Sequence, residues 1–189
     1  MFWTKKLWLS VLHVVRNLFY ITQLNNIDKI NYDNIVISGV SRKELKDIYA
    51  VYARIYNNKY PKIQSRIVYF FLSQKCVFSA KEKTTGKIIG IMLFYKTKRD
   101  VIENTIHIGF TGILPEFQGQ KIGTKITVHS VNHFKKSNLN GISTRISLNN
   151  LPSLKTYMGL GFKPVDKYFD KKINEERYYL ICPFNSNFC

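Results

Sequence analysis

Apolar and polar positions alternate along this chain with two periods, one typical of strands and the other of helices. Turn residues and capping residues separate the periodic segments. In chain order the pattern predicts a strand at 35–37, helices at 41–57 and 61–72, a hairpin within 76–98, a strand at 105–114, a helix at 120–136, a strand at 142–148, a helix at 151–160 and a last strand at 176–184. This order indicates an α/β chain of the α+β type, with a mixed central β-sheet flanked by helices on both faces.

The first 25 residues differ from the rest and predict an extra N-terminal amphipathic helix, followed by a single domain over 26–189. Its polar positions Lys6, Ser10, His13 and Asn17 recur at helical spacing, and apolar residues fill the remainder. The stretch 7–21 is shorter than the roughly 18 to 20 apolar residues that span a bilayer. The segment 1–24 therefore either packs on the domain or a partner, or makes peripheral contact with a membrane interface.

Composition narrows the range of partners. The chain has 189 residues, 45% of them hydrophobic, which is enough for one folded domain with a real core. Its 29 Lys and Arg against 12 Asp and Glu give a net charge of +17. Such a field favours anionic partners: a phosphate-bearing cofactor, nucleic acid, an acidic membrane surface or a nucleotide-linked substrate. The charges are scattered and no RNA-binding motif is present, which argues against nucleic acid as the main partner.

The cysteines bear on metal binding and on the compartment. Cys76, Cys182 and Cys189 are odd in number and widely spaced. This spacing argues against a disulfide framework and against a zinc site, and no metal is expected. Free thiols in a reducing cytoplasm are the simplest interpretation, with a peripheral position at the inner membrane face if the first helix binds lipid.

A glycine-containing loop joins the strand at 105–114 to the next helix. It consists of Gln118, Gly119, Gln120, Lys121, Ile122 and Gly123, with Thr124 following. Backbone N–H groups at a helix start have no partner within the helix, and together with the helix dipole they stabilise a phosphate. Short glycine loops are common, so the loop by itself is a weak signal.

A second segment, "NNLPSLKTYMGLGF" at 149–162, follows. Asn150 and Tyr157 are seven residues apart, about 10 Å along one helix face. Gly161 is placed to end the helix and Phe162 to return to the core. On its own this segment is typical of a capped helix with a buried tyrosine.

Taken together, the two segments resemble the GNAT superfamily of acetyl-CoA-dependent N-acetyltransferases. The family's signature, Gln or Arg, two residues, Gly, one residue, then Gly or Ala, aligns on 118–123. Its later element aligns on Asn150, Ser153, Tyr157, Gly161 and Phe162. The order of elements matches over about 34–182, most strongly over 105–162. One position departs from the signature, because Lys121 stands where the family has its first Gly.

The resemblance implies roles for these residues. The strand amides of Thr111 and Ile113 would hold the pantetheine arm and polarise the thioester carbonyl. The loop amides would hold the pyrophosphate, and Asn150 and Ser153 would contribute to the cofactor site. Tyr157 would protonate the departing thiolate.

Family members often place a glutamate eleven residues before the signature, and here that position is His107. A histidine near its ordinary pKa of about 6.5 can act as a general base. His107 shares strand parity with Thr111 and Ile113, although a bulge at Gly109 or Gly112 would upset that count. The alternative is a histidine on a half-exposed strand with no catalytic role. Glu103 and Glu116, which fall in predicted turns, are weaker candidates for the base.

The sequence thus predicts an N-acyltransferase that moves an acetyl group from acetyl-CoA to a primary amine. The positive charge and the apolar first helix favour an anionic or membrane-proximal acceptor, such as a nucleotide-linked amino sugar or a lipid-linked precursor. The alternative is a non-catalytic CoA-binding module with the same fold.

Overall fold

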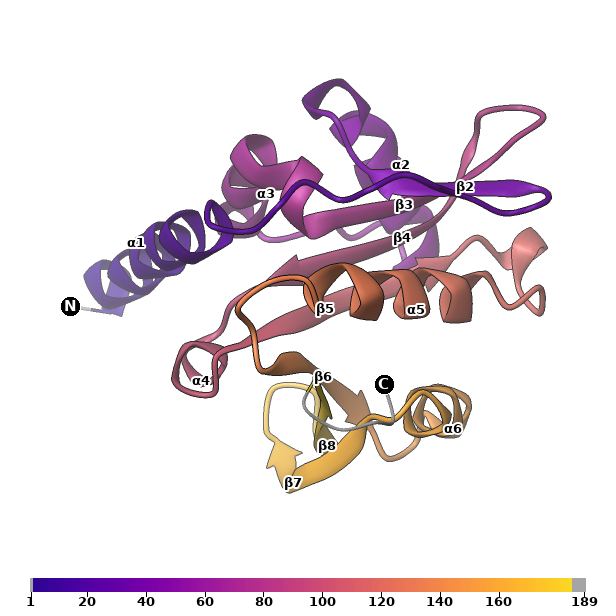
Figure 1. The fold of residues 1–189 in the computed structure, drawn as a ribbon. Coiled ribbons are helices and arrows are strands. Elements are labelled where there is room, and N and C mark those ends of the chain that lie inside the picture. The colour runs from indigo at the N-terminus through magenta and orange to yellow at the C-terminus, as the bar shows by residue number, and fades with distance from the viewer. Residues whose placement is uncertain (1, 185–189) are drawn as a thin grey trace.

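One mixed sheet of eight strands organises the computed structural model, which describes residues 2–184 (Figure 1). The strand order is β1-β2-β3-β4-β5-β6-β8-β7. The strands are β1 (Ile30–Asn31), β2 (Ile35–Gly39), β3 (Val77–Glu82), β4 (Ile88–Tyr95), β5 (Thr105–Ile113), β6 (Gly141–Ser147), β7 (Lys163–Asp170) and β8 (Glu175–Pro183). The α-helices are α1 (Phe2–Ile21), α2 (Leu45–Ile55), α3 (Ile63–Cys76), α4 (Lys98–Ile102), α5 (Ile122–Phe134) and α6 (Leu151–Gly159). Short 3₁₀ turns cover Arg42–Glu44 and Pro115–Phe117.

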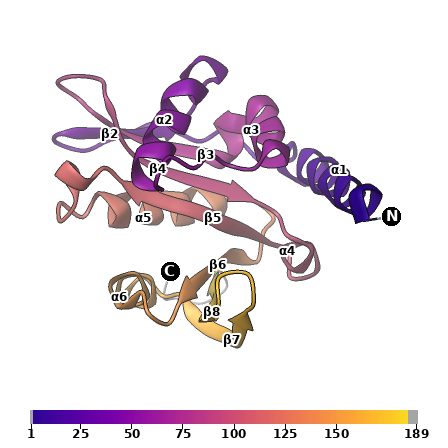
Figure 2. The same cartoon turned by 180° about the vertical axis from the view of Figure 1, so that it is seen from behind.

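Helices cover both faces of the sheet, as the sequence predicts. Helices α2 and α3 lie on one face and α5 on the other, which Figure 2 shows from behind. The capping box of Ser41 and Glu44 is formed, so the predicted helix start is confirmed. On the α5 face the core includes the rings of Phe78, Phe94 and Phe134, which pack in tilted and edge-on contacts.

The sequence pattern assigned no segment to β7, and it missed two short elements. The two-residue strand β1 lies in the stretch that follows the first helix, and its ladder to β2 is too short to leave a periodic pattern. Helix α4 has only five residues, and its start is fixed by a capping box between Thr97 and Asp100. Both elements are shorter than the runs of residues over which a periodic pattern can be recognised.

Strands β5 and β6 are the parallel pair of the sheet, and they separate along their length. Their pairing runs from Thr105 opposite Gly141 to Ile108 opposite Thr144, yet β5 continues to Ile113 and β6 to Ser147. Helix α5 forms the crossover between them, as a parallel connection requires. Strands β6, β8 and β7 therefore turn away from the rest of the sheet (Figures 1 and 2).

A bulge in β5 changes which residues share a face. Ile108 lies opposite Phe94, but Phe110 lies opposite Leu93, so Gly109 is the extra residue. A side chain there would collide with the ring of Tyr95, because a Cβ atom would come within 2.1 Å of it. The bulge puts His107 on the α2 face against Tyr95 and Thr111 on the α5 face against Tyr157. The prediction that His107 shares a face with Thr111 and Ile113 is wrong for this reason.

Helix α1 packs against α3, and the polar residues His13 and Asn17 face inward. Asn17 is fully buried, and its side chain accepts from the Lys96 N–H at 2.6 Å and donates to the Lys96 carbonyl at 3.1 Å. Arg16 donates to the same carbonyl at 2.9 Å. The predicted amphipathic helix is present, and its polar residues hold it to the β4–α4 connection.

Cysteine chemistry differs in part from expectation. Cys76 is a free, buried thiol, and burial raises its pKa far above the ordinary range. Cys182 is disulfide-bonded, which corrects the prediction of three free thiols. Cys189 lies outside the described residues. Within 2–184 no group of three or more His, Cys, Asp or Glu side chains is placed to hold a metal ion. None of the helices in this range is long and apolar enough to cross a bilayer.

Candidate active site

A cleft opens where β5 and β6 separate. Its volume is about 430 Å³. Four residues singled out in the sequence, Thr111, Asn150, Ser153 and Tyr157, line it. The structure therefore brings the strand and the second sequence segment to one place, because α6 follows β6 and lies beside the gap.

Backbone donors of β5 face this cleft. The Leu114 N–H donates to Ile89 of β4 at 2.9 Å. N–H groups alternate in direction along a strand, so those of Ile113 and Thr111 point the other way, toward the side that β6 has left. These are the two amides expected to hold an acyl thioester.

Tyr157 lies at the centre of the cleft and is largely buried. Its hydroxyl is 2.9 Å from the Thr111 hydroxyl, and its ring packs edge-on against Phe162. Burial raises the pKa of this phenol above its usual value, and the hydrogen bond with Thr111 offsets that only in part. The phenol therefore keeps its proton at neutral pH and can donate it.

The loop before α5 presents a row of free amides. Lys125 is the first residue of this helix whose N–H reaches back into the loop, to Lys121 at 3.0 Å. No described residue accepts a hydrogen bond from the N–H groups of 119–124. Gln118 steadies the loop, since its side-chain amide donates to the Ile113 carbonyl at 3.2 Å. A Cβ atom at Gly123 would have only Ile113 nearby, at 3.8 Å, so the helix start is open to a ligand. These features fit a phosphate group.

The backbone conformation of Lys121 is one that favours glycine, which is the residue that the family signature has at this position. Lys121 caps α5 with φ of 58° and ψ of 18°, in the left-handed region. Gly119 in the same loop has φ of 79°. A residue with a Cβ atom pays a cost in this region that glycine does not, so Lys121 carries local strain.

Asn150 and Ser153 begin helix α6. The Asn150 side chain accepts a hydrogen bond from the Ser153 N–H at 3.2 Å and so caps the helix. This bond orients the helix whose next turns carry Tyr157. Gly161, with φ of 85°, follows the end of the helix as predicted, and Phe162 is buried.

His107 does not line the cleft, and only 3% of its surface is exposed. Its Nδ1 is 2.7 Å from the Ser143 hydroxyl, which donates in turn to the buried Asp100. Burial lowers the pKa of His107 to about 4, although Asp100 opposes the shift. A neutral, enclosed imidazole is poorly placed to take a proton from an incoming amine. The half-exposed histidine expected from the sequence is not found.

The weaker candidates for a base also lie elsewhere. Glu103 binds Arg99 at 2.7 Å and accepts from the Tyr179 hydroxyl at 2.9 Å. Glu116 pairs with Arg54 at 2.9 Å and with Lys87 at 3.4 Å. Neither residue lines the cleft.

Sequence reasoning missed the other side of the cleft. Its lining includes Tyr52 of α2 and Tyr56 just after that helix, Phe110 of β5, Arg145 of β6, and Glu175 and Arg177 of β8. The rings of Tyr52 and Phe110 are 4.2 Å apart. These residues come from four separate elements, and no spacing along the chain marks them as a group.

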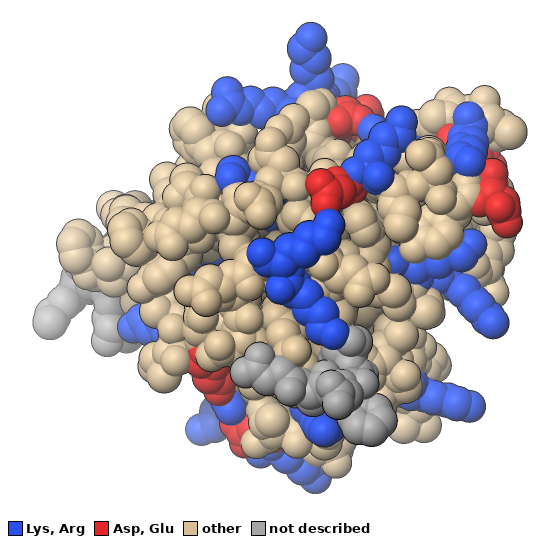
Figure 3. All heavy atoms as spheres, in the orientation of Figure 1, with Lys and Arg blue, Asp and Glu red and all other residues tan. Residues whose placement is uncertain are grey.

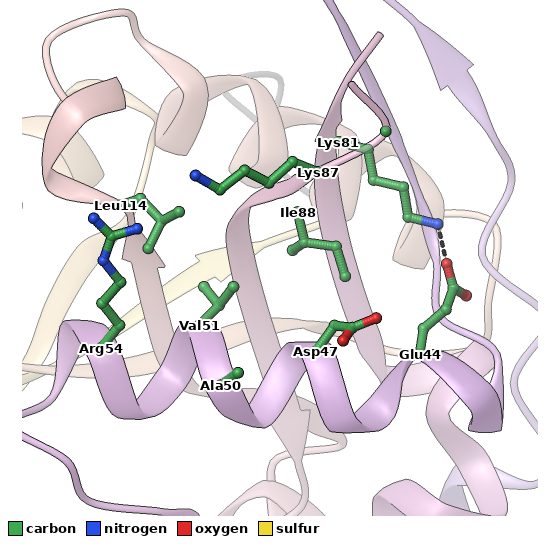
Figure 4. Close-up of a pocket in the computed structure, with 10 residues that line it drawn as sticks. Glu44, Asp47, Ala50, Val51, Arg54, Lys81, Lys87, Ile88 and Leu114 are labelled. Carbon is green, nitrogen blue, oxygen red and sulfur yellow. Dashed lines mark hydrogen bonds and ion pairs between the residues drawn. The ribbon is translucent and has the colours of Figure 1, made fainter. Parts of the chain in front are cut away.

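A second hollow of about 350 Å³ lies between α2 and the β3–β4 hairpin (Figure 4). Most of its charged groups form ion pairs: Lys81 with Glu44, and Arg54 and Lys87 with the neighbouring Glu116. None of the residues predicted to bind or act on a ligand lines it. The β5–β6 cleft is therefore the candidate active site.

The surface is basic without a single dense patch. Lys and Arg side chains spread over the face shown in Figure 3, with few acidic groups among them. This distribution agrees with the scattered charge of the sequence.

The model of the acetyltransferase (GNAT) family matches residues 45–162, more than half of the chain. This chain belongs to the GNAT acetyltransferase family. Helix α1 precedes the matched region. No curated protein matches the GNAT chain in sequence.

Solved structures share its fold at low sequence identity. The ribosomal-protein-S18-alanine N-acetyltransferase of Escherichia coli is 16% identical, with a TM-score of 0.62 over 80% of this chain and 95% of that one. Arabidopsis thaliana Naa50, in complex with the bisubstrate analogue CoA-Ac-MVNAL, is 18% identical, with a TM-score of 0.65 over 78% and 97%. An N-acetyltransferase from Staphylococcus aureus Mu50 is 18% identical, with a TM-score of 0.65 over 81% and 100%. The GNAT fold is thus shown by sequence family and by structure.

Proposed function

We propose that this GNAT protein is an N-acetyltransferase that moves an acetyl group from acetyl-CoA to a primary amine. The observation that carries the proposal is the meeting of the free β5 amides with the protonated Tyr157 hydroxyl in one cleft. The free amides at the start of α5 add a site for the phosphates of CoA. The β5 amides and the Tyr157 hydroxyl suit the thioester group of an acyl-CoA, and the amides at the start of α5 suit its phosphates.

Each group has a step in the reaction. The amides of Thr111 and Ile113 stabilise negative charge on the carbonyl oxygen as the amine nitrogen attacks the carbonyl carbon. The new C–N bond forms, the C–S bond breaks, and the thiolate takes its proton from Tyr157. The nitrogen releases one proton to solvent as the amide forms, and the Tyr157 phenolate takes a proton back from solvent. Holding both reactants in the cleft supplies much of the acceleration.

The solved relatives support a reaction of this kind. The Escherichia coli protein is named for the alanine of ribosomal protein S18 that it acetylates, and Naa50 was solved with CoA joined to an acetylated peptide. We extend this chemistry to an acceptor of our own proposal, an anionic or membrane-proximal amine, because the chain carries a net charge of +17.

Binding and turnover test the proposal separately. Calorimetry with acetyl-CoA should show binding by the full chain. An amine panel should release CoA thiol, and mass spectrometry should find the acetylated amine. Binding without thiol release from any amine would favour the second candidate, a non-catalytic CoA-binding module. Two observations favour that alternative: Lys121 has a strained backbone, and His107 is enclosed.

A further inference from the structure

One acidic and one basic side chain in the cleft have no ionic partner. Glu175 is the carboxylate among the residues that line the cleft, and Arg145 and Arg177 are the cations. Arg177 is engaged, since it lies 3.4 Å from Asp170 and also donates to the Arg145 carbonyl at 2.5 Å. Among residues 2–184, neither Glu175 nor Arg145 forms a salt bridge.

The strand register puts these two side chains on the same face. Arg145 lies opposite Tyr179 in the β6–β8 ladder, and Ser147 lies opposite Arg177. Side chains two residues apart on a strand share a face, so Glu175 follows Arg177 and Tyr179 on that side. His107 reaches the same face through its contact with Ser143. This is the α2 face of the sheet, whereas Thr111 contacts Tyr157 on the α5 face.

We propose that Glu175 and Arg145 form the acceptor subsite, which takes a small primary amine that also carries a carboxylate or phosphate group. This inference rests on the proposed function. Arg145 pairs with the anionic group, and its guanidinium suits both carboxylate and phosphate oxygens. Glu175 holds the ammonium group and removes one proton from it. The neutral nitrogen then attacks, and the proton stays on the Glu175 carboxyl until it passes to solvent.

Steady-state kinetics with matched pairs of amines test the subsite. The probes are β-alanine against β-alaninamide, and 2-aminoethyl phosphate against ethanolamine, so that each pair differs in the anionic group alone. The wild-type protein should prefer the anionic member at least tenfold in kcat/KM, and the better of the two pairs identifies carboxylate or phosphate. Arg145→Gln should abolish the preference while the Kd for acetyl-CoA stays unchanged, and Arg145→Lys should restore part of it.

Glu175 requires its own variant and a matched control. Glu175→Gln should lower kcat by about 100-fold at neutral pH, and the loss should shrink as the pH rises because more of the amine is then neutral. Glu176→Gln is the control, since Glu176 is the next residue and pairs with Lys167 outside the cleft. Its kcat should equal that of the wild type.

The outcomes separate this inference from the proposed function. Equal use of both members of each pair, acceptance of only an alanine-headed peptide, or acceptance of none of the four probes by a protein that binds acetyl-CoA would overturn the subsite. So would a Glu175→Gln variant that behaves like Glu176→Gln. A wild-type protein that does not bind acetyl-CoA would instead remove the proposed function itself.

Helix α1 carries a second, independent inference. Asn17 is buried and Ser10 and His13 are partly buried, whereas the outer face of the helix is apolar and exposed. Trp8, Val15 and Phe19 are 63%, 58% and 62% exposed, and Leu7 and Val11 extend the same surface. These residues recur at helical spacing, so they form one continuous stripe. No described residue covers it.

Charge identifies what the stripe contacts. The first acidic residue of the chain is Asp28, and Lys5 and Lys6 precede the stripe in the sequence. A helix with a wide apolar face, tryptophan and only cationic charge matches an anionic lipid surface. The geometry points to peripheral binding of α1, through this stripe, to a membrane that contains anionic lipid.

Vesicle co-sedimentation with the full chain tests this binding. The wild type should sediment with vesicles of phosphatidylcholine and phosphatidylglycerol, and at least tenfold more weakly with phosphatidylcholine alone. The double variant with Trp8→Glu and Val15→Glu should lose the binding. Val165→Glu is the control, because Val165 is 51% exposed on β7, at the other edge of the sheet.

Two results would overturn the lipid assignment. One is sedimentation of the double variant equal to that of Val165→Glu. The other is a wild-type dimer in sedimentation velocity without lipid that Trp8→Glu and Val15→Glu convert to monomer, since a second copy of the chain would then cover the stripe.

Discussion

The two sides of the cleft are built in different ways. The proposed cofactor side consists of the cleft residues Thr111, Asn150, Ser153 and Tyr157, together with Ile113 and the loop at 118–124, all within one continuous half of the chain. The proposed acceptor side consists of Tyr52, Tyr56, Phe110, Arg145, Glu175 and Arg177, which come from α2 and the residue after it, β5, β6 and β8. The first is local in sequence and the second is assembled across the sheet.

The difference lies in the kind of group that each side uses. The cofactor side relies on backbone N–H groups, and a free amide needs a particular turn or helix start, which leaves glycines and capping residues in the sequence. The acceptor side relies on side chains, which any strand can present. Their meeting depends on strand pairing alone. The cofactor side is thus readable from spacing, whereas the acceptor side is not.

The largest expected effect is a loss of acetyl-CoA affinity, caused by a substitution on the cofactor side alone. Gly123→Glu puts a charged side chain at the open start of α5, where the backbone should approach the phosphates. We expect the Kd for acetyl-CoA to rise by more than about 100-fold, which corresponds to roughly 2.7 kcal/mol. Calorimetry measures it, and circular dichroism checks the fold.

The control for this change is Gly159→Glu, near the end of α6, where a Cβ atom would meet no heavy atom within 4 Å. It should bind acetyl-CoA as the wild type does. A folded Gly123→Glu protein with unchanged affinity would remove the loop from the cofactor site.

The buried histidine on the acceptor face should make stability depend on pH. His107 has a pKa of about 4 in the folded chain and about 6.5 when unfolded, so the unfolded state binds more protons between these values. The contribution of the neutral His107 to the free energy of unfolding is fully present above pH 6.5 and is lost as the pH falls toward 4. We expect the wild type to lose about 2 kcal/mol more than His107→Gln between pH 7 and pH 5 in urea unfolding.

Turnover of the same His107→Gln variant sharpens the comparison. An enclosed histidine outside the cleft predicts a loss of less than about tenfold. A loss of 100-fold or more that fades at high pH would restore His107 as the base, and would count against Glu175.

Tyr157 stands where the two sides meet. Tyr157→Phe removes the hydroxyl and leaves the ring against Phe162. Because a thiolate leaves well without help, we expect kcat to fall only about tenfold, or roughly 1.4 kcal/mol. The loss should grow at high pH if the phenol supplies the proton. A loss that shrinks instead would make Tyr157 a base, and stopped-flow measurement of thiol release over pH distinguishes the two.

The smallest effect concerns the strained loop. Lys121→Gly relieves a left-handed residue with a Cβ atom, and the greater freedom of glycine in the unfolded chain offsets part of the gain. We expect a net increase in the free energy of unfolding of about 0.5 kcal/mol. Affinity for acetyl-CoA should fall a few-fold, since the Lys121 ammonium no longer offsets phosphate charge. Tighter binding would show that the side chain crowds the site.

The sequence by itself determined the parts that depend on neighbours along the chain. The capping box at Ser41, the hairpin around Gly86 and the helix cap at Asn150 were predictable, because dihedral angles and local hydrogen bonds set them. The open amides before α5 belong to the same group. The family resemblance was also predictable, because its motifs reflect these local constraints.

Tertiary structure alone decided the rest. The bulge at Gly109 turned His107 away from Thr111. The sequence offered Gly109 and Gly112 as possible bulge positions but could not show whether either is used, and a side chain at 109 would collide with the Tyr95 ring on the neighbouring strand. The inward position of Asn17 on α1 depends on Lys96, which lies 79 residues away. Glu175 and Arg145 share a face only because β6 pairs with β8. A period along the chain records which residues share a side of one element, but not which element that side will meet.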